Sequence, residues 1–366
     1  MDKKDIYLWL KSIDGIGDKT IDKIEEEVGS ISQIVNLSEK EILKLKNINS
    51  NITKNIVKCK SHAYIEKIKN VLKDNKIEYI SIDDEKYPKK LREIYNPPKI
   101  LFYRGDISIL NENINLAMVG SRKASSYGRN IAKNMSKQLS DIGINIVSGL
   151  ATGIDSFSHV GCMEGKSKTI AILGSSVDNP LPKSNLQMAN KIIEQGGVLI
   201  SEFYPNSNVI PSNFYNRNRI ISGISDGVIV VEAASRSGAL ITVEFALEQG
   251  KNIFAVPGNI TSEMSKGCHK IIKEGAILLD NIEDIIKEYN IDSNKLQKHS
   301  KNYDDIGLDE ESNLIIHHLK KEGTLQIDAI CDYTDMEIKN VNTILNKLAL
   351  CGLIIEGSNN TYSLSI

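Results

Sequence analysis

Short apolar runs alternate with segments of helical hydrophobic spacing through residues 114–288. The runs are rich in β-branched residues and predict strands at 115–119, 145–147, 169–173, 198–200, 228–231, 253–256 and 277–279. Two earlier strands, 78–82 and 100–103, flank a connection that contains several prolines. Strands that alternate with helices predict an α/β fold, a Rossmann-like doubly wound sheet that is mostly parallel.

The stretch 214–258 carries the clearest βαβ pattern. A buried strand at 227–232 is followed by Ser237 and Gly238, which open a helix with apolar side chains at Leu240, Val243 and Leu247. A helix start behind small residues offers free N–H groups to an anion. We expect that start to be crowded, so that Gly238→Val would damage folding.

Upstream of that strand, two arginines and an asparagine stand beside aromatic residues: Arg217, Asn218 and Arg219 follow Phe214 and Tyr215. Guanidinium groups suit phosphate and aromatic rings suit bases. A salt-bridged helix start is the alternative interpretation.

Glycine-rich loops follow several of the predicted strands, whose carboxyl ends lie at one sheet edge in this fold. Gly120, Ser121 and Arg122 follow the first strand, Gly149 and Gly153 frame the second loop, and Lys183 lies in the third. The pattern matches neither GxGxxG nor GxxxxGK[ST], which argues against a dinucleotide fingerprint or an ATP-binding P-loop. Together with Ser237 and Gly238, these loops predict a composite site for a polyanion.

Asp155 and His159 stand four residues apart on the helix expected after the second loop. They could form a catalytic dyad or half of a metal site. A local ion pair that caps the helix is the favoured alternative.

Two small segments flank the sheet. Residues 1–76 predict a helical domain of helix-hairpin-helix or SAM-like type, because Gly15 and Gly17 allow a tight turn whose N–H groups can meet a phosphate. A helical module that contacts protein is the alternative there.

With the sheet domain at 77–288, a polar linker is expected at 289–308 and a winged-helix domain at 309–366. The recognition helix expected at 336–350 contains only Lys339 and Lys347 as basic residues, so contact with protein is at least as well supported as DNA reading.

Composition limits the class of function. The net charge of −2 excludes a globally basic surface, so nucleic-acid binding would need a local patch. The five scattered cysteines include no CxxC pair and predict neither disulfides nor a zinc site, and we expect no metal and no cofactor. Without a long apolar run, the sequence predicts neither a signal peptide nor a membrane span, and we expect a cytoplasmic protein.

The motifs together resemble the DNA-processing protein A (DprA/Smf) family across residues 80–280. The similarity includes VGSRKASSYG, SGLATGIDSFSH, FYNRNRIISG and VVEAASRSGALIT. The resemblance implies a homodimer that is not an enzyme, binds single-stranded DNA and helps load the RecA recombinase in natural transformation. It also implies phosphate contacts at Gly120, Ser121, Arg122 and Lys183, with 214–219 nearby. Thr152 stands where the family often has Arg, and Leu181 where Tyr is usual.

Two other functions remain open from the sequence. Ser237, Gly238, Thr242 and Glu244 resemble the motif of nucleotide phosphoribohydrolases, in which a buried glutamate could act as general base. A protein adaptor with a vestigial DNA groove is the other alternative.

Overall fold

The structure is a computed structural model that describes residues 1–291, 308–350, 353–357 and 360–364. Contacts divide the chain into one unit at 1–292 and a second at 293–366. Most of the linker expected at 289–308 lies outside the described residues. No helix among the described residues is long and apolar enough to cross a membrane.

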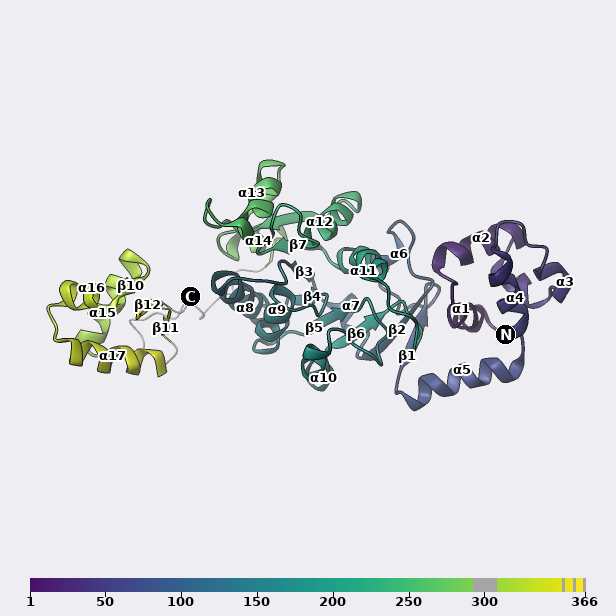
Figure 1. Cartoon of the computed structure of the whole chain (residues 1–366), viewed down its shortest axis with the longest axis horizontal. Coiled ribbons are helices and arrows are strands. Elements are labelled where there is room, and N and C mark those ends of the chain that lie inside the picture. The colour runs from purple at the N-terminus through teal and green to yellow at the C-terminus, as the bar shows by residue number, and fades with distance from the viewer. Residues whose placement is uncertain (292–307, 351–352, 358–359, 365–366) are drawn as a thin grey trace. The chain divides into compact units, whose positions relative to one another are not determined.

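A single large sheet forms the core of the first unit (Figure 1). Its described strands have the spatial order β1-β2-β6-β5-β4-β3-β7-β8-β9. They are β1 (Glu78–Ser81), β2 (Ile100–Gly105), β3 (Asn115–Val119), β4 (Asn145–Ser148), β5 (Thr169–Ile172), β6 (Val198–Ser201), β7 (Gly227–Val230), β8 (Asn252–Ala255) and β9 (Ile277–Leu278). The strands from β6 to β9 in this order are parallel, whereas β1 and β2 pair antiparallel at one end. The predicted doubly wound sheet is confirmed.

The order in which strands are added to the sheet changes direction after β6, and the switch point lies between the neighbouring strands β3 and β7. Strands β3 to β6 are added one after another on one side, and the chain then returns to place β7 on the other side of β3. The register aligns Leu116 with Gly227 and Val119 with Val230. The loops after these two strands therefore diverge and leave a crevice at the carboxyl ends, where ligands bind in this class of fold.

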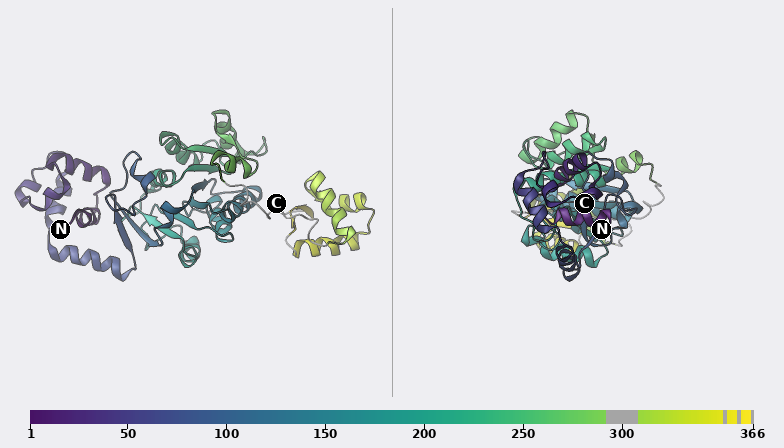
Figure 2. Two further views of the ribbon diagram at one scale, coloured as in Figure 1. Left: turned by 180° about the vertical axis from the view of Figure 1, so that it is seen from behind. Right: turned by 90° about the vertical axis from the view of Figure 1, so that its right-hand side faces the viewer.

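Helices cover both faces of this sheet, as the views in Figures 1 and 2 show. Strand side chains alternate between the faces: Ile170 and Ile172 belong to one apolar cluster, and Ala171 belongs to the other. The first cluster includes residues of α6 (Lys89–Arg92), α11 (Pro211–Ile224), α12 (Ala239–Glu248) and α13 (Lys266–Lys273). The remaining helices of the sheet region are α7 (Ile109–Glu112), α8 (Ser126–Asp141), α9 (Ile154–Met163), α10 (Leu186–Glu194) and α14 (Glu283–Glu288), with short 3-10 turns η2 (Lys183–Asn185) and η3 (Glu263–Ser265).

Helix α12 packs by a different stripe from the one that we expected. The predicted apolar positions included Leu247, but its side chain is 63% exposed. The buried stripe consists of Ala239, Thr242, Val243 and Ala246. These side chains are mostly small and let the helix approach the sheet closely, which turns Leu247 toward solvent.

The N-terminal helices share an apolar core with the sheet. They are α1 (Lys3–Lys11), α2 (Asp18–Val28), η1 (Ile31–Val35), α3 (Glu39–Ile42), α4 (Ser50–Cys59) and α5 (His62–Asp74). Their buried residues, Trp9 among them, lie in the same cluster as Ile100 and Phe102 of β2. Gly15 has a φ of 85°, a conformation that favours glycine, and so allows the tight turn between α1 and α2.

The second unit is a small winged-helix-like domain. It contains α15 (Glu310–Glu322), α16 (Ile327–Thr334) and α17 (Ile338–Leu350) with a three-stranded antiparallel sheet of order β10-β12-β11. The strands are β10 (Leu325–Gln326), β11 (Ile354–Glu356) and β12 (Thr361–Leu364). Of the two lysines expected on the recognition helix, Lys347 forms an ion pair with Asp309 at 2.6 Å.

Candidate nucleic-acid interface

A cavity of about 510 Å³ opens at the carboxyl ends of β3 and β7, where the sheet reverses its winding. We call it the switch-point cavity. Eight of the predicted site residues line it: Gly120, Ser121, Arg122, Phe214, Arg217, Asn218, Ser237 and Gly238. They come from three separate elements, which are the loop after β3, helix α11 and the turn before α12. The fold therefore brings together residues that lie more than 100 positions apart in the sequence.

The loop after β3 is fixed by its backbone. The N–H of Ser121 donates to the carbonyl of Glu232 at 2.7 Å, and the N–H of Ile154 donates to the carbonyl of Ser121 at 3.2 Å. A Cβ on Gly120 would lie 2.5 Å from Ile154 Cγ1, so this close approach requires glycine. The loop is therefore held in place before any ligand arrives.

Two cations project from this fixed loop. Arg122 and Lys123 are both exposed and both line the cavity, and neither forms an ion pair with any described residue. The hydroxyl of Ser121, by contrast, accepts the N–H of Lys123 at 3.0 Å and so serves the turn itself. Lys123 is a site residue that sequence reasoning missed, although its place directly after Arg122 could have indicated it.

Arg217 lines the cavity, but its guanidinium is hydrogen-bonded to the protein backbone. It is 4% exposed, and its Nη1 donates to the carbonyls of Gly149, at 2.7 Å, and Ile172. Burial lowers the pKa of Arg217 to about 10, and the neighbouring carboxylate of Asp155 opposes that shift. The guanidinium therefore ties α11 to the ends of β4 and β5, and is not a free phosphate clamp.

The second glycine loop supports the site, and its Ala151 and the adjoining Asp155 line the cavity. Asp155 accepts the N–H groups of Gly149 at 3.1 Å and Ala151 at 3.3 Å. A Cβ on Gly149 would lie 2.5 Å from Arg217 Nη2, and one on Gly153 would lie 2.2 Å from the carbonyl of Ser121. These glycines do not line the cavity, and they allow the loops that do line it to pack closely.

Asp155 and His159 do not form a dyad. His159 is fully buried, and its Nδ1 lies 2.6 Å from Thr169 Oγ1, while the Asp155 carboxylate faces the N–H groups of its own loop. Burial lowers the pKa of His159 to about 3, so its ring is neutral and the local ion pair is absent too. The described residues hold no cluster of side chains that could bind a metal.

Lys183 and Arg219 lie outside the switch-point cavity. Lys183 is exposed, and its loop is joined to the second glycine loop because Asn185 Nδ2 donates to the carbonyl of Leu150 at 2.9 Å. Arg219 points to the other side of α11, where it pairs with Glu202 at 2.8 Å. A spacing of two residues along a helix separates Arg217 and Arg219 by roughly 200°. The two side chains therefore point to nearly opposite sides of α11.

The exposed aromatic side chain of the site is Tyr215. Phe214 is half-buried, and a Cβ on Gly174 would lie 2.7 Å from its ring. Tyr215 is 48% exposed, lines the cavity and contacts Phe245 edge to face at 5.7 Å between centroids. Sequence reasoning noted Tyr215 but did not include it in the site.

The turn before α12 is more open than we expected. Gly238 has a φ of −61°, and a Cβ built there meets nothing within 4 Å, so the predicted crowding is wrong. Glu244 is exposed and does not line the cavity. A buried glutamate base, which the hydrolase alternative required, is therefore not present at this position.

The chain is similar in sequence and in structure to known proteins. The model of the family described as DNA recombination-mediator protein A matches residues 78–290. The DNA processing protein DprA of Bacillus subtilis is 39% identical over 212 residues, which cover 58% of this chain and 71% of that protein. The X-ray structure of DNA processing protein A from Streptococcus pneumoniae superposes with a TM-score of 0.68 at 33% identity and covers 79% of this chain and 99% of that one. A structure of DNA processing protein A from Helicobacter pylori, which concerns the single-stranded DNA binding mode of that protein, superposes with a TM-score of 0.53 at 26% identity. It covers 59% of this chain and 97% of that one.

Proposed function

The chain belongs to the DNA recombination-mediator protein A family, and from that membership we propose that its switch-point cavity binds single-stranded DNA. The observation that carries the proposal is the pair of exposed cations, Arg122 and Lys123, on a rigid loop beside the half-exposed ring of Tyr215. Cations that contact phosphates and an aromatic ring that stacks on a base are the two components of sequence-tolerant single-strand binding.

The rigidity of the loop supports the same proposal. Ser121 and Ile154 hold the loop through backbone hydrogen bonds, and Arg217 with Asp155 holds its surroundings. A strand that binds a fixed loop loses less free energy to ordering of the protein than one that binds a mobile loop. The binding is local, which is compatible with a net charge of −2 for the whole chain.

Replacing Arg122 tests the proposal. We expect Arg122→Ala to weaken binding of labelled oligothymidylate by about tenfold at low salt, since one phosphate contact is lost. The dependence of log K on log salt should become shallower by about 0.7. Fluorescence anisotropy at low and moderate salt measures both, with duplex DNA as competitor.

Lys166→Ala is the matched control, because Lys166 is an exposed cation outside the cavity. It should bind as the parent does. Equal affinity in Arg122→Ala and the parent would remove the loop after β3 from the site, and an absence of binding at low salt would contradict the proposal as a whole.

The family further suggests roles that we include in the proposal. The chain would protect incoming strands, pass them to the RecA recombinase and act as a homodimer in the cytoplasm without enzymatic activity. Nuclease protection and RecA-dependent ATP hydrolysis on a coated strand test the first two, and light scattering after gel filtration tests the dimer. Release of free base from nucleoside monophosphates would contradict the absence of activity.

We propose supporting contacts for Lys183, which lies at the same sheet edge, and none for Arg219 in this cavity.

A further inference from the structure

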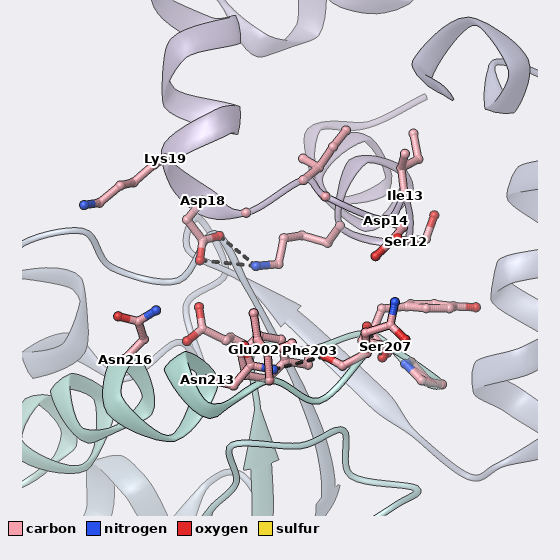
Figure 3. A pocket seen from close by; sticks show the side chains of 18 of the residues that line it. Ser12, Ile13, Asp14, Asp18, Lys19, Glu202, Phe203, Ser207, Asn213 and Asn216 are labelled. Carbon is pink, nitrogen blue, oxygen red and sulfur yellow. Dashed lines mark hydrogen bonds and ion pairs between the residues drawn. The ribbon is translucent and has the colours of Figure 1, made fainter. Parts of the chain in front are cut away.

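A second cavity, of about 730 Å³, lies between the α1–α2 turn and helix α11, and we call it the hairpin cavity. Figure 3 places Asp18 and Lys19 on one side of it and Glu202, Asn213 and Asn216 on the other. Its wall is rich in side-chain amides, namely Asn96, Asn206, Asn208, Asn213 and Asn216. Each amide both donates and accepts hydrogen bonds, as the edge of a nucleobase does.

Helix α11 is a wall of both cavities. Asn213, Asn216 and Arg219 face the hairpin cavity, whereas Phe214, Arg217 and Asn218 face the switch-point cavity. Ser212 and Tyr215 of the same helix are exposed, and Tyr215 lines the switch-point cavity. A strand that leaves one cavity would reach the other after crossing roughly the diameter of one helix, about 10 Å.

Buried charges form the floor of the hairpin cavity. Lys11 pairs with Asp18 at 3.2 Å, and Arg219 pairs with Glu202 at 2.8 Å. Burial raises the pKa of Glu202. Burial opposes ionisation of Asp18 as well, but its pKa is lowered, chiefly by the charge of Lys11.

Two groups on this floor, Arg219 and Glu202, each have one atom that lacks a partner in the described part of the chain. Arg219 is 7% exposed, and its Nη1 has no hydrogen-bond partner among the described residues. Glu202 is 5% exposed, and its Oε1 likewise has no partner among the described residues. A buried donor or acceptor without a partner is unfavourable, so the site is suited to a ligand that brings both an acceptor and a donor.

The α1–α2 turn supplies a place for a phosphate. Helix α2 has 11 residues and begins after Gly17, where no side chain caps its free N–H groups. Lys19 in its first turn is exposed and forms no ion pair with a described residue. Free N–H groups at a helix start, with a cation beside them, favour an anion.

We propose that the hairpin cavity takes one nucleotide of a single strand whose neighbours occupy the switch-point cavity. Its base lies against the asparagine wall with an acceptor toward Arg219, and its phosphate lies toward Lys19 and the α1–α2 turn. This inference rests on the proposed function, and it extends the DNA path from the sheet to the N-terminal helices.

Oligothymidylates of two lengths test this path. A strand of about 6 nucleotides should fill the switch-point cavity, and one of about 20 should reach both cavities. We expect Lys19→Ala and Asn216→Leu each to weaken binding of the long strand about fivefold and to leave the short strand unchanged. Both residues are exposed, so the variants should fold. Lys23→Ala, on the same helix but outside the cavity, is the matched control and should bind as the parent does.

The outcomes separate this inference from the proposed function. Binding that depends on Arg122 at both lengths but is unaffected by Lys19→Ala and Asn216→Leu would overturn the hairpin cavity and leave the switch-point cavity intact. A loss of short-strand binding in Lys19→Ala would also overturn it, because the two cavities would then not act in sequence. If the parent binds neither strand, both proposals fail together.

Discussion

At the scale of single residues, charge and burial decide what each arginine does. Arg122 stands on an exposed loop without an ion pair among the described residues, so it can meet a phosphate. Arg217 and Arg219 carry the same group but are 4% and 7% exposed, and each is engaged within the protein. The two sequence segments that contain these arginines, 120–122 and 217–219, give no indication of this division of roles.

The glycines in and around the site differ in how closely other atoms surround them, and this difference gives a prediction. Gly149→Ala should lower the free energy of unfolding by about 1–3 kcal/mol, because the added methyl would meet Arg217 Nη2 and Asp155. The guanidinium cannot move aside without losing its hydrogen bonds to Gly149 and Ile172. Urea unfolding followed by circular dichroism measures the change.

Gly238→Ala is the control, and we expect it to be neutral or to raise stability by up to about 1 kcal/mol. Gly238 already has helical φ, and open space surrounds a Cβ there. If both variants lost the same stability, the close contact of Gly149 with Arg217 would not exist in solution.

At the scale of elements, helix α9 is joined to β5 by a buried polar contact. His159 on α9 and Thr169 at the start of β5 lie 2.6 Å apart between Nδ1 and Oγ1. The ring is fully buried, and this burial lowers its pKa to about 3 and so favours the neutral histidine in the folded protein. The joint between α9 and β5 is therefore sensitive to acid.

The sign of that sensitivity follows from linkage. The unfolded chain binds a proton at His159 near pH 6.5, and the folded chain does so only near pH 3. Stability from this group is therefore complete above pH 6.5 and falls by up to about 1.4 kcal/mol per unit as the pH drops below it.

Thermal unfolding of the parent and His159→Gln between pH 7.5 and about 5 measures this effect. The variant should start less stable and lose less stability on acidification. Parallel pH profiles for the two proteins would show that His159 titrates normally and is not buried as described.

At the scale of the whole molecule, the N-terminal helices and the sheet share one apolar core. Trp9, Ile100 and Phe102 belong to a single cluster, and Lys11 and Asp18 meet Arg219 and Glu202 at its border. We propose 1–76, 77–288 and 309–366 as the domains of the chain. The first two would be structurally interdependent, whereas the buried core of 309–366 consists of its own residues, and the adjacent Leu308 packs against it.

Removal of residues 1–76 should therefore destabilise the sheet. We expect the fragment 77–291 to unfold at lower urea concentration than the parent, because the face of β2 that carries Ile100 and Phe102 loses its cover. The fragment 309–366 should unfold as it does in the full chain. A fragment 77–291 of unchanged stability would contradict the shared core.

The sequence by itself determined much of this protein. The short continuous apolar runs located the strands of the sheet, since a parallel sheet that helices cover on both sides buries both faces of each strand. The glycine loops indicated the binding edge, because parallel strands bring their carboxyl ends together. Gly120, Ser121, Arg122, Ser237 and Gly238 were expected at one site on that basis, and all five line the switch-point cavity.

Only the tertiary structure decided which of these groups face solvent. Burial of Arg217 depends on carbonyls of Gly149 and Ile172, and the pairing of Arg219 depends on Glu202. The hairpin cavity likewise joins α2 and α11, which are almost 200 residues apart. Such contacts depend on how elements pack in three dimensions, and no local pattern of side chains records them.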